Sequence, residues 1–170
     1  MNVFLDTSIV NYILDLENER KDKIWQENIK YLKLLKKAGA NGAMIFIVNP
    51  TVMWQINNVT DENRKEKLIA KSKEFAFEDF TLFFFPLTFP LFFPTPEQIQ
   101  NIETICKKHP KLEDDKKIIA DACFNENIDI LLTVDKDLSG QEKIGKVKIM
   151  LPKQLWDYYE SIQLHQCRDA

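Results

Sequence analysis

Strand-length apolar runs, separated by segments with helical periodicity, constrain the fold of this chain most. Residues 43–48 (AMIFIV) are wholly apolar, and residues 2–5 and 128–134 are nearly so. Wholly apolar runs, unlike alternating ones, are typical of parallel strands that are covered on both faces. The alternation of strands and helices predicts a three-layer α/β/α fold with a mainly parallel central sheet. A length of 170 residues suits a single domain, residues 1–170.

Helices are expected between these runs. Thr7 and Ser8 are expected to cap the first helix, and Gly39 to end the second. Further helices are expected at 50–59, 61–77, 96–106, 113–127 and 152–164, with further strands at 80–87 and 146–150.

Aspartates follow two of the expected strands directly. Asp6 follows residues 2–5, and Asp135 follows residues 128–134. Ligands of parallel α/β sheets bind outside the carboxyl ends of the strands. The expected helix at 113–127 begins with Asp114 and Asp115, so three acidic elements are expected to meet at one sheet edge.

Two interpretations of these aspartates stay open. An Asp after a strand is most often a turn or N-cap residue, and this applies to Asp6, Asp135 and Asp137. Asp121, on another face of its helix, is expected to be a salt-bridge partner or a supporting group. The alternative is a carboxylate cluster, which needs a cation because carboxylates repel one another. Oxygen ligands suit Mg²⁺ or Mn²⁺, which can assist phosphodiester hydrolysis.

Composition limits the partners and the cellular location. With a net charge of -3 and a pI of about 5.5, the chain is not expected to bind nucleic acid through a global positive charge. Its three cysteines form no zinc-type cluster, and Cys123 is expected in the core. The first residues do not resemble a signal peptide, and residues 82–93 are too short and proline-rich to span a membrane. We therefore expect a cytoplasmic protein without a membrane segment.

Several segments resemble the PIN domain family of metal-dependent ribonucleases. They are NVFLDTSIVNYIL, IFIVNPTVMWQI, DKKIIADA, IDILLTVDKDL and the tail VKIMLPKQLWDYY, in that order. The resemblance spans nearly the whole chain, and its most specific part is the unit that ends in TVDKDL. It implies RNA as the substrate, Mg²⁺ or Mn²⁺ as the cofactor, and a toxin of a toxin–antitoxin pair as one biological role.

The resemblance also implies roles for individual residues. Those implied as catalytic are Asp6, Asp115 and Asp135, and the implied metal ligands are Asp6, Asp115, Asp135 and Asp137. The implied supporting residues are Thr7, Ser8, Gln55 and Thr133, and the implied RNA contacts are Lys116 and Lys117.

One position departs from the family pattern. Gln55 stands where the family usually has a second acidic residue, and an amide oxygen adds no negative charge. Two functions therefore stay open: an active endoribonuclease, or a degenerate PIN domain that binds RNA or a protein without cutting. A third reading, a phosphatase of the haloacid dehalogenase type, rests on DKDLS at 135–139. It is disfavoured because the nucleophile strand of that class comes first in the chain.

A segment rich in Phe and Pro occupies about residues 77–96. Residues 77–93 hold eight of the twelve Phe. The segment is interpreted either as a buried strand with core anchors or as an exposed patch for a partner. The second interpretation favours a homodimer, an antitoxin or another protein partner.

Overall fold

A computed structural model describes residues 1–14, 22–48, 50–75, 96–108, 116–124, 127–140 and 143–166 of the chain. Its centre is a five-stranded sheet with the order β2-β1-β3-β5-β4. The strands are β1 (Asn2–Leu5), β2 (Ile45–Val48), β3 (Ile130–Leu132), β4 (Lys143–Ile144) and β5 (Val147–Met150). All neighbouring pairs are parallel except β4 and β5, which are antiparallel. The expected α/β class and mainly parallel sheet are confirmed.

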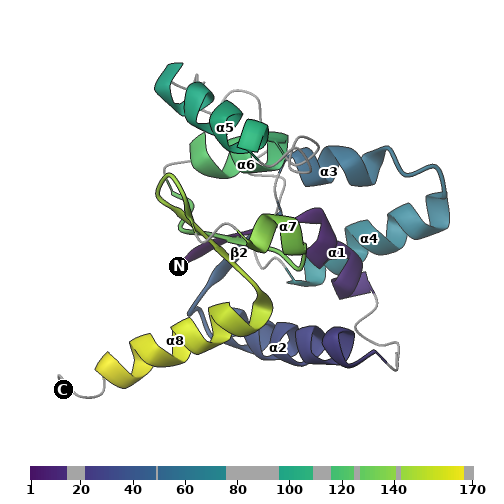
Figure 1. The fold of residues 1–170 in the computed structure, drawn as a ribbon. Coiled ribbons are helices and arrows are strands. Elements are labelled where there is room, and N and C mark those ends of the chain that lie inside the picture. Colours follow the sequence, from purple (N-terminus) through teal and green to yellow (C-terminus); the bar gives the residue numbers. More distant parts are fainter. Residues whose placement is uncertain are drawn as a thin grey trace.

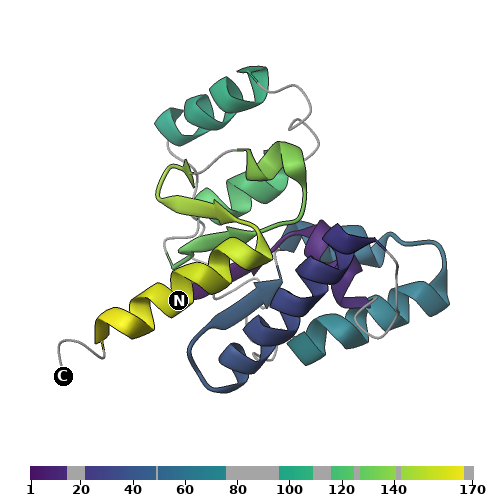
Figure 2. The same cartoon turned by 60° about the horizontal axis from the view of Figure 1, so that its bottom comes forward.

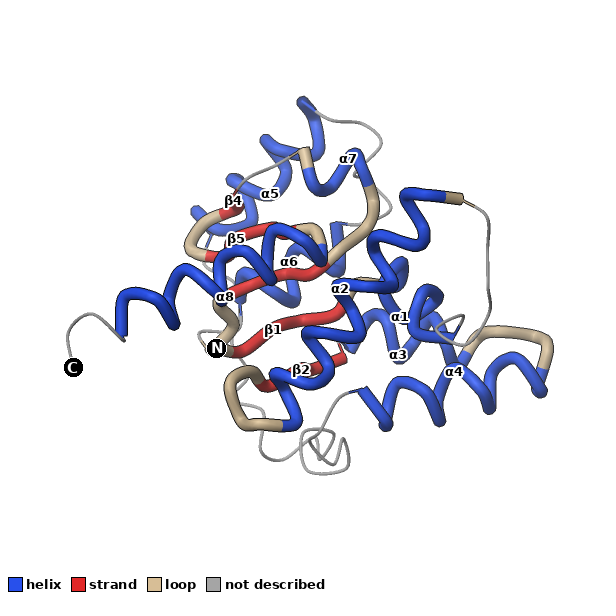
Figure 3. The backbone as a smooth tube through the Cα atoms, turned by 90° about the horizontal axis from the view of Figure 1, so that it is seen from below, coloured by secondary structure: helices blue, strands red, loops and turns tan. Residues whose placement is uncertain are grey.

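Helices lie on both faces of this sheet. They are α1 (Thr7–Leu14), α2 (Lys23–Ala40), α3 (Pro50–Asn57), α4 (Glu62–Phe75), α5 (Pro96–Lys108), α6 (Lys116–Phe124), α7 (Lys136–Ser139) and α8 (Pro152–Gln166). Figures 1 and 2 show α2 and α8 packed together on one side, with α3, α5 and α6 on the other. The view from below in Figure 3 shows α2 and α8 crossing the near face of the strands.

The position of β1 inside the sheet determines where the candidate site lies. Val3 pairs with Phe46 of β2 on one side and with Ile130 of β3 on the other. Every residue of β3 is buried, as expected for a strand covered on both faces. Ile45 is 37% exposed, because β2 ends the sheet among the described residues. The carboxyl ends of β1, β2 and β3 therefore lie side by side.

Short elements account for most differences from the expected elements. The helix α7 and the strand β4 were not expected, since pieces of four and two residues show no periodicity. Gly145, with φ of 60°, makes the tight turn between β4 and β5. The expected caps Thr7 and Ser8 were wrong, because both residues lie inside the first turn of α1.

The second helix also ends differently from the expectation. It runs to Ala40, one residue beyond Gly39, and Gly42 is the residue with positive φ, at 75°. The expected strand at 80–87, the Phe/Pro-rich segment at 77–96 and the start of the helix expected at 113 lie outside the described residues. Within the described ranges, no helix has the length and apolar character needed to cross a membrane.

Candidate functional site at the ends of β1 and β3

The Asp6 carboxylate is buried where β1, an interior strand of the sheet, ends. The residue is only 3% exposed, and its backbone N–H donates to the carbonyl oxygen of Leu132 in β3 at 3.0 Å. The parallel pairing of β1 with β3 thus continues as far as Asp6. An ionisable group at such a position needs hydrogen-bond partners, because burying an unpaired charge is very costly.

Three donors surround the two Asp6 oxygens. The Thr7 N–H donates to Oδ1 at 2.6 Å. The hydroxyls of Ser8 and Thr133 donate to Oδ2 at 2.5 and 2.7 Å. An N-cap carboxylate would instead bind the N–H of the second or third helical residue. The simple capping interpretation therefore does not describe the Asp6 side chain, although its backbone oxygen accepts from the N–H groups of Ile9 and Val10.

The two hydroxyls also accept hydrogen bonds from the loop that follows β3. The Ser8 Oγ accepts from the Val134 N–H at 3.1 Å, and the Thr133 Oγ1 accepts from the Asp135 N–H at 3.0 Å. Each hydroxyl donates to Asp6 and accepts from the backbone, so its single O–H donor is committed to the carboxylate. The network fixes the orientation of the Asp6 carboxylate and the path of the chain from Val134 to Asp135.

The Asp135 carboxylate caps the short helix α7. Its Oδ1 accepts from the backbone N–H groups of Asp137 and Leu138, at 2.7 and 3.1 Å. The N-cap interpretation is therefore confirmed for Asp135. Asp137 is not a cap, because it lies exposed inside the first turn of α7. Asp135 is half-buried and follows the strand next to that of Asp6.

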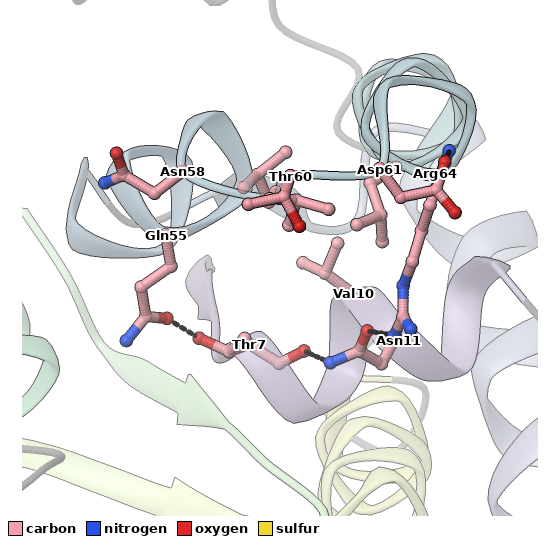
Figure 4. A pocket seen from close by; sticks show the side chains of 11 residues that line it. Thr7, Val10, Asn11, Gln55, Asn58, Thr60, Asp61 and Arg64 are labelled. Atoms are coloured by element: carbon pink, nitrogen blue, oxygen red, sulfur yellow. Dashed lines mark hydrogen bonds between the residues drawn. The ribbon is translucent and has the colours of Figure 1, made fainter.

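Gln55 is connected to this network through Thr7. The Thr7 hydroxyl donates to the Gln55 Oε1, which brings α3 into contact with the start of α1. Figure 4 shows this pair at one end of a pocket. Thr7 therefore links the side-chain amide of Gln55 to the Asp6 carboxylate. A carboxylate at position 55 would accept the same hydrogen bond and add a negative charge.

Asp121 holds the start of α3 in place. Its Oδ2 accepts from the Thr51 hydroxyl at 2.6 Å and from the Thr51 N–H at 3.2 Å. Burial raises the pKa of the Asp121 carboxyl above its usual value, while the Thr51 hydrogen bonds and the Lys117 charge oppose the rise. The expected supporting role is consistent with this contact, which orients the helix that carries Gln55. The Thr51 partner was missed, since nothing in the sequence links positions 70 apart.

Lys117 contacts an exposed aromatic ring. Its Nζ lies 5.5 Å from the centre of the Trp54 ring, and Trp54 is 62% exposed. Lys116 is half-buried at the first position of α6. Asp115, which precedes this helix, lies outside the described residues. A solvated lysine beside an exposed aromatic side chain is a combination that suits contacts with single-stranded nucleic acid.

The structure thus connects six of the expected site residues and leaves others undescribed or unconnected. Continuous hydrogen bonds join Asp6, Thr7, Ser8, Gln55, Thr133 and Asp135. Among the described residues, no three His, Cys, Asp or Glu side chains are close enough together to hold a metal ion. The described donors are instead two carboxylates on adjacent strand ends and one amide.

A pocket with a volume of about 440 Å³ lies between α1, α3 and α4. Its lining includes Thr7 and Gln55, so it borders the Asp6 network. Sequence reasoning missed Asn11 and Arg64, which line the other end (Figure 4). Their only sequence signal is a polar residue on each of two helices, which is too common to single them out.

Cys123 is not a plausible nucleophile of this site. Its thiol donates to the Ile144 carbonyl oxygen at 3.5 Å, and burial raises the pKa of the thiol to about 11. The side chain packs against the core, as expected.

No protein-family model matches the chain, and no curated protein or solved structure matches it either.

Proposed function

We propose that this protein is a PIN-type, metal-dependent endoribonuclease that hydrolyses RNA phosphodiester bonds. The observation that carries the proposal is the buried Asp6 carboxylate at the end of an interior parallel strand. Hydroxyls from two elements orient it, and Asp135 follows the adjacent strand. Nucleases that use a metal ion need a carboxylate held in a fixed orientation.

The described donors are of the type that hard divalent cations prefer. Mg²⁺ is usually held by one or two carboxylates together with waters and substrate phosphates. Asp6, Asp135 and the amide oxygen of Gln55 are all oxygen donors, and the resemblance adds Asp115 and Asp137. When bound, Mg²⁺ or Mn²⁺ would activate water and neutralise charge on the scissile phosphate.

The other residues of the network support these donors. Ser8 and Thr133 hold the Asp6 carboxylate, so that it does not need to reorganise when a ligand arrives. Thr7 holds the Gln55 amide. Lys117, at the start of α6, would approach the RNA backbone, and Lys116 is proposed to act with it.

A second candidate function is RNA or protein binding without cleavage. Gln55 favours it, since the amide that accepts from Thr7 brings no negative charge to the site. A weaker negative potential lowers affinity for a divalent cation. In this case the domain keeps its scaffold and its binding surface, but the reaction is slow or absent.

Cleavage assays with three proteins distinguish the two functions. The native protein, Asp6→Asn and Gln55→Glu are each incubated with a mixed panel of fluorogenic RNAs and Mn²⁺ or Mg²⁺. Cleavage by the native protein that EDTA and Asp6→Asn both abolish would support the nuclease. Cleavage by Gln55→Glu alone would support the degenerate domain. If none of the three proteins cleaves RNA while the fold is intact, the native protein is not a nuclease and Gln55→Glu does not restore one.

The resemblance extends the proposal to a toxin that acts in the cytoplasm, forms a homodimer and pairs with an antitoxin. Growth arrest on expression, relieved by a co-expressed neighbouring small reading frame, tests the toxin role. Light scattering of the purified protein tests the dimer.

A further inference from the structure

We propose that the pocket between α1, α3 and α4 binds one nucleotide of a single-stranded RNA, with Arg64 holding its phosphate. This inference rests on the proposed ribonuclease function and identifies the substrate contact beside the candidate site. The pocket volume of about 440 Å³ is within the range of small-molecule sites and is large enough for a nucleotide.

Arg64 has unused donors at the mouth of the pocket. The residue is exposed, and its Nη2 donates to the Asn11 Oδ1 at 3.2 Å. No carboxylate among the described residues forms an ion pair with its guanidinium. An arginine fork offers five N–H donors, and phosphate oxygens match its geometry. Most of these donors therefore remain available for a ligand.

A relay of hydrogen bonds orients Arg64 from the candidate site. The Asn11 side-chain amide donates to the Thr7 carbonyl oxygen at 3.1 Å, and its Oδ1 accepts from Arg64. The Thr7 hydroxyl donates to Gln55 at the opposite end of the pocket, as Figure 4 shows. Arg64 on α4 and the Asp6 network are thus linked through the same short helix, α1.

The middle of the pocket is apolar. Val10, Ile56, Val59 and Leu68 line it between the two polar ends. Apolar side chains cover the face of a base, and every base has such a face. This arrangement favours a whole nucleotide over an inorganic ion. An unpaired base is needed, since a base inside a duplex is stacked on its neighbours.

Asp61 sets a limit on the negative charge of the ligand. It also lines the pocket, and its Oδ1 accepts from the backbone N–H of Arg64 at 3.1 Å, at the start of α4. Positive charge at a helix N-terminus partly offsets this carboxylate. The pair of one cation and one anion favours a monoanionic phosphodiester, so inorganic phosphate should bind more weakly than a nucleotide.

Side-chain NMR resonances test the proposal without any cleavage. The 5′-methyl phosphate of adenosine, a monoanionic phosphodiester, is titrated into the labelled full-length protein in EDTA, and adenosine and inorganic phosphate are titrated separately. The Asn11 side-chain amide and the Arg64 Nε–H report on the pocket. We expect the nucleotide to shift both signals, and adenosine and phosphate to bind more weakly. Arg64→Gln should weaken nucleotide binding, read at Asn11, by about tenfold or more, since charged hydrogen bonds are lost.

Lys67→Gln is the matched control. Lys67 is an exposed cation on the same helix, three residues after Arg64, and does not line the pocket. Equal losses in Lys67→Gln and Arg64→Gln would overturn the proposal, because diffuse charge would explain them. No shift at Asn11 or Arg64 would also overturn it.

The two proposals fail in distinguishable ways. If native protein cleaves RNA and Arg64→Gln leaves the KM unchanged, the pocket proposal fails and the nuclease stands. If nucleotide binds through Arg64 but no variant cleaves RNA, the nuclease fails and the pocket stands.

Discussion

Asp6 and Asp135 follow neighbouring parallel strands, yet the protein uses their carboxylates differently. Asp6 is buried and accepts hydroxyl hydrogen bonds from α1 and from the end of β3. Asp135 is half-exposed and accepts backbone hydrogen bonds from its own helix α7. Position after a strand is therefore a weak indicator of function. Hydroxyl donors, one of them from the distant Thr133, distinguish the held Asp6 carboxylate from the capping Asp135 carboxylate, which accepts from backbone N–H groups of its own helix.

Removing the Asp6 carboxylate, compared with removing that of Asp135, should have its largest effect on the stability of the fold. Asp6→Ala removes the acceptor of the buried Thr133 hydroxyl and of the half-buried Ser8 hydroxyl, and the unmet donors should cost about 3 kcal/mol in the free energy of unfolding. Asp135→Ala removes a helix cap, for about 1 kcal/mol. Urea unfolding of both variants measures the difference. Equal losses would show that the hydroxyl network contributes nothing beyond a cap.

Thr133 links the two aspartates, and its hydroxyl should be the next most sensitive group. It is fully buried, donates to Asp6 and accepts from the Asp135 N–H. Thr133→Val keeps the shape and loses both hydrogen bonds, which should cost about 2 kcal/mol. Thr133→Ser keeps the hydroxyl and serves as the control. Faster amide hydrogen exchange at Asp135 in the Val variant alone would confirm the link.

Asp121 extends the comparison to a third aspartate. Like Asp6 it accepts a hydrogen bond from a Thr hydroxyl, but it is only half-buried. Asp121→Ala should cost about 1 kcal/mol through the lost Thr51 contacts. Burial raises the folded-state pKa of the Asp121 carboxyl above the usual 3.8. The contribution of this carboxyl to the free energy of unfolding is therefore fully present below pH 3.8. It is lost as the pH rises through the folded-state pKa.

The pH dependence of Asp121 is measured against Asp121→Asn, which cannot ionise. From acid pH upward, native protein should lose stability relative to the Asn variant. A constant difference between the two unfolding free energies at all pH values would contradict the raised pKa.

Metal addition should produce the smallest stability effect, and it should distinguish Asp6 from the exposed Asp137. Ligands that bind only the folded state raise its melting temperature. Mn²⁺ should raise the melting temperature of Gln55→Glu by a few degrees and of native protein by less, since the added carboxylate strengthens cation binding. Asp6→Asn should lose the rise, and Asp137→Asn, at an exposed position, should retain more of it. A rise that survives Asp6→Asn would place the cation elsewhere.

The sequence was most informative where an element is long or wholly apolar. The runs at β1, β2 and β3 predicted the parallel sheet, since both faces of such strands are covered. The short pieces α7 and β4 were missed, because four or two residues carry no period. For Asp135, capping was one of the two interpretations that the sequence left open, and the short helix α7, which was not expected, confirms it.

Contacts between distant side chains were the least predictable part of the site. The resemblance indicated Ser8 and Thr133 as supporting residues, but not the directions of their hydrogen bonds. Asp121 with Thr51, and Arg64 with Asn11, join positions on separate helices that share no pattern. Such pairs depend on how the helices pack, which hydrophobic periodicity alone does not determine.

The insertion of β1 between β2 and β3 has a consequence for the order of folding. Thr133 and Asp6 are 127 positions apart, so their hydrogen bond closes one of the longest loops in the chain. Loops of this size form late, because their closure entropy must be overcome first. During synthesis the first strand can pair with β2 long before β3 exists. A nascent or truncated chain that lacks β3 would therefore carry Asp6 without the Thr133 hydroxyl, and the nuclease activity that we propose would begin only when β3 has joined the sheet.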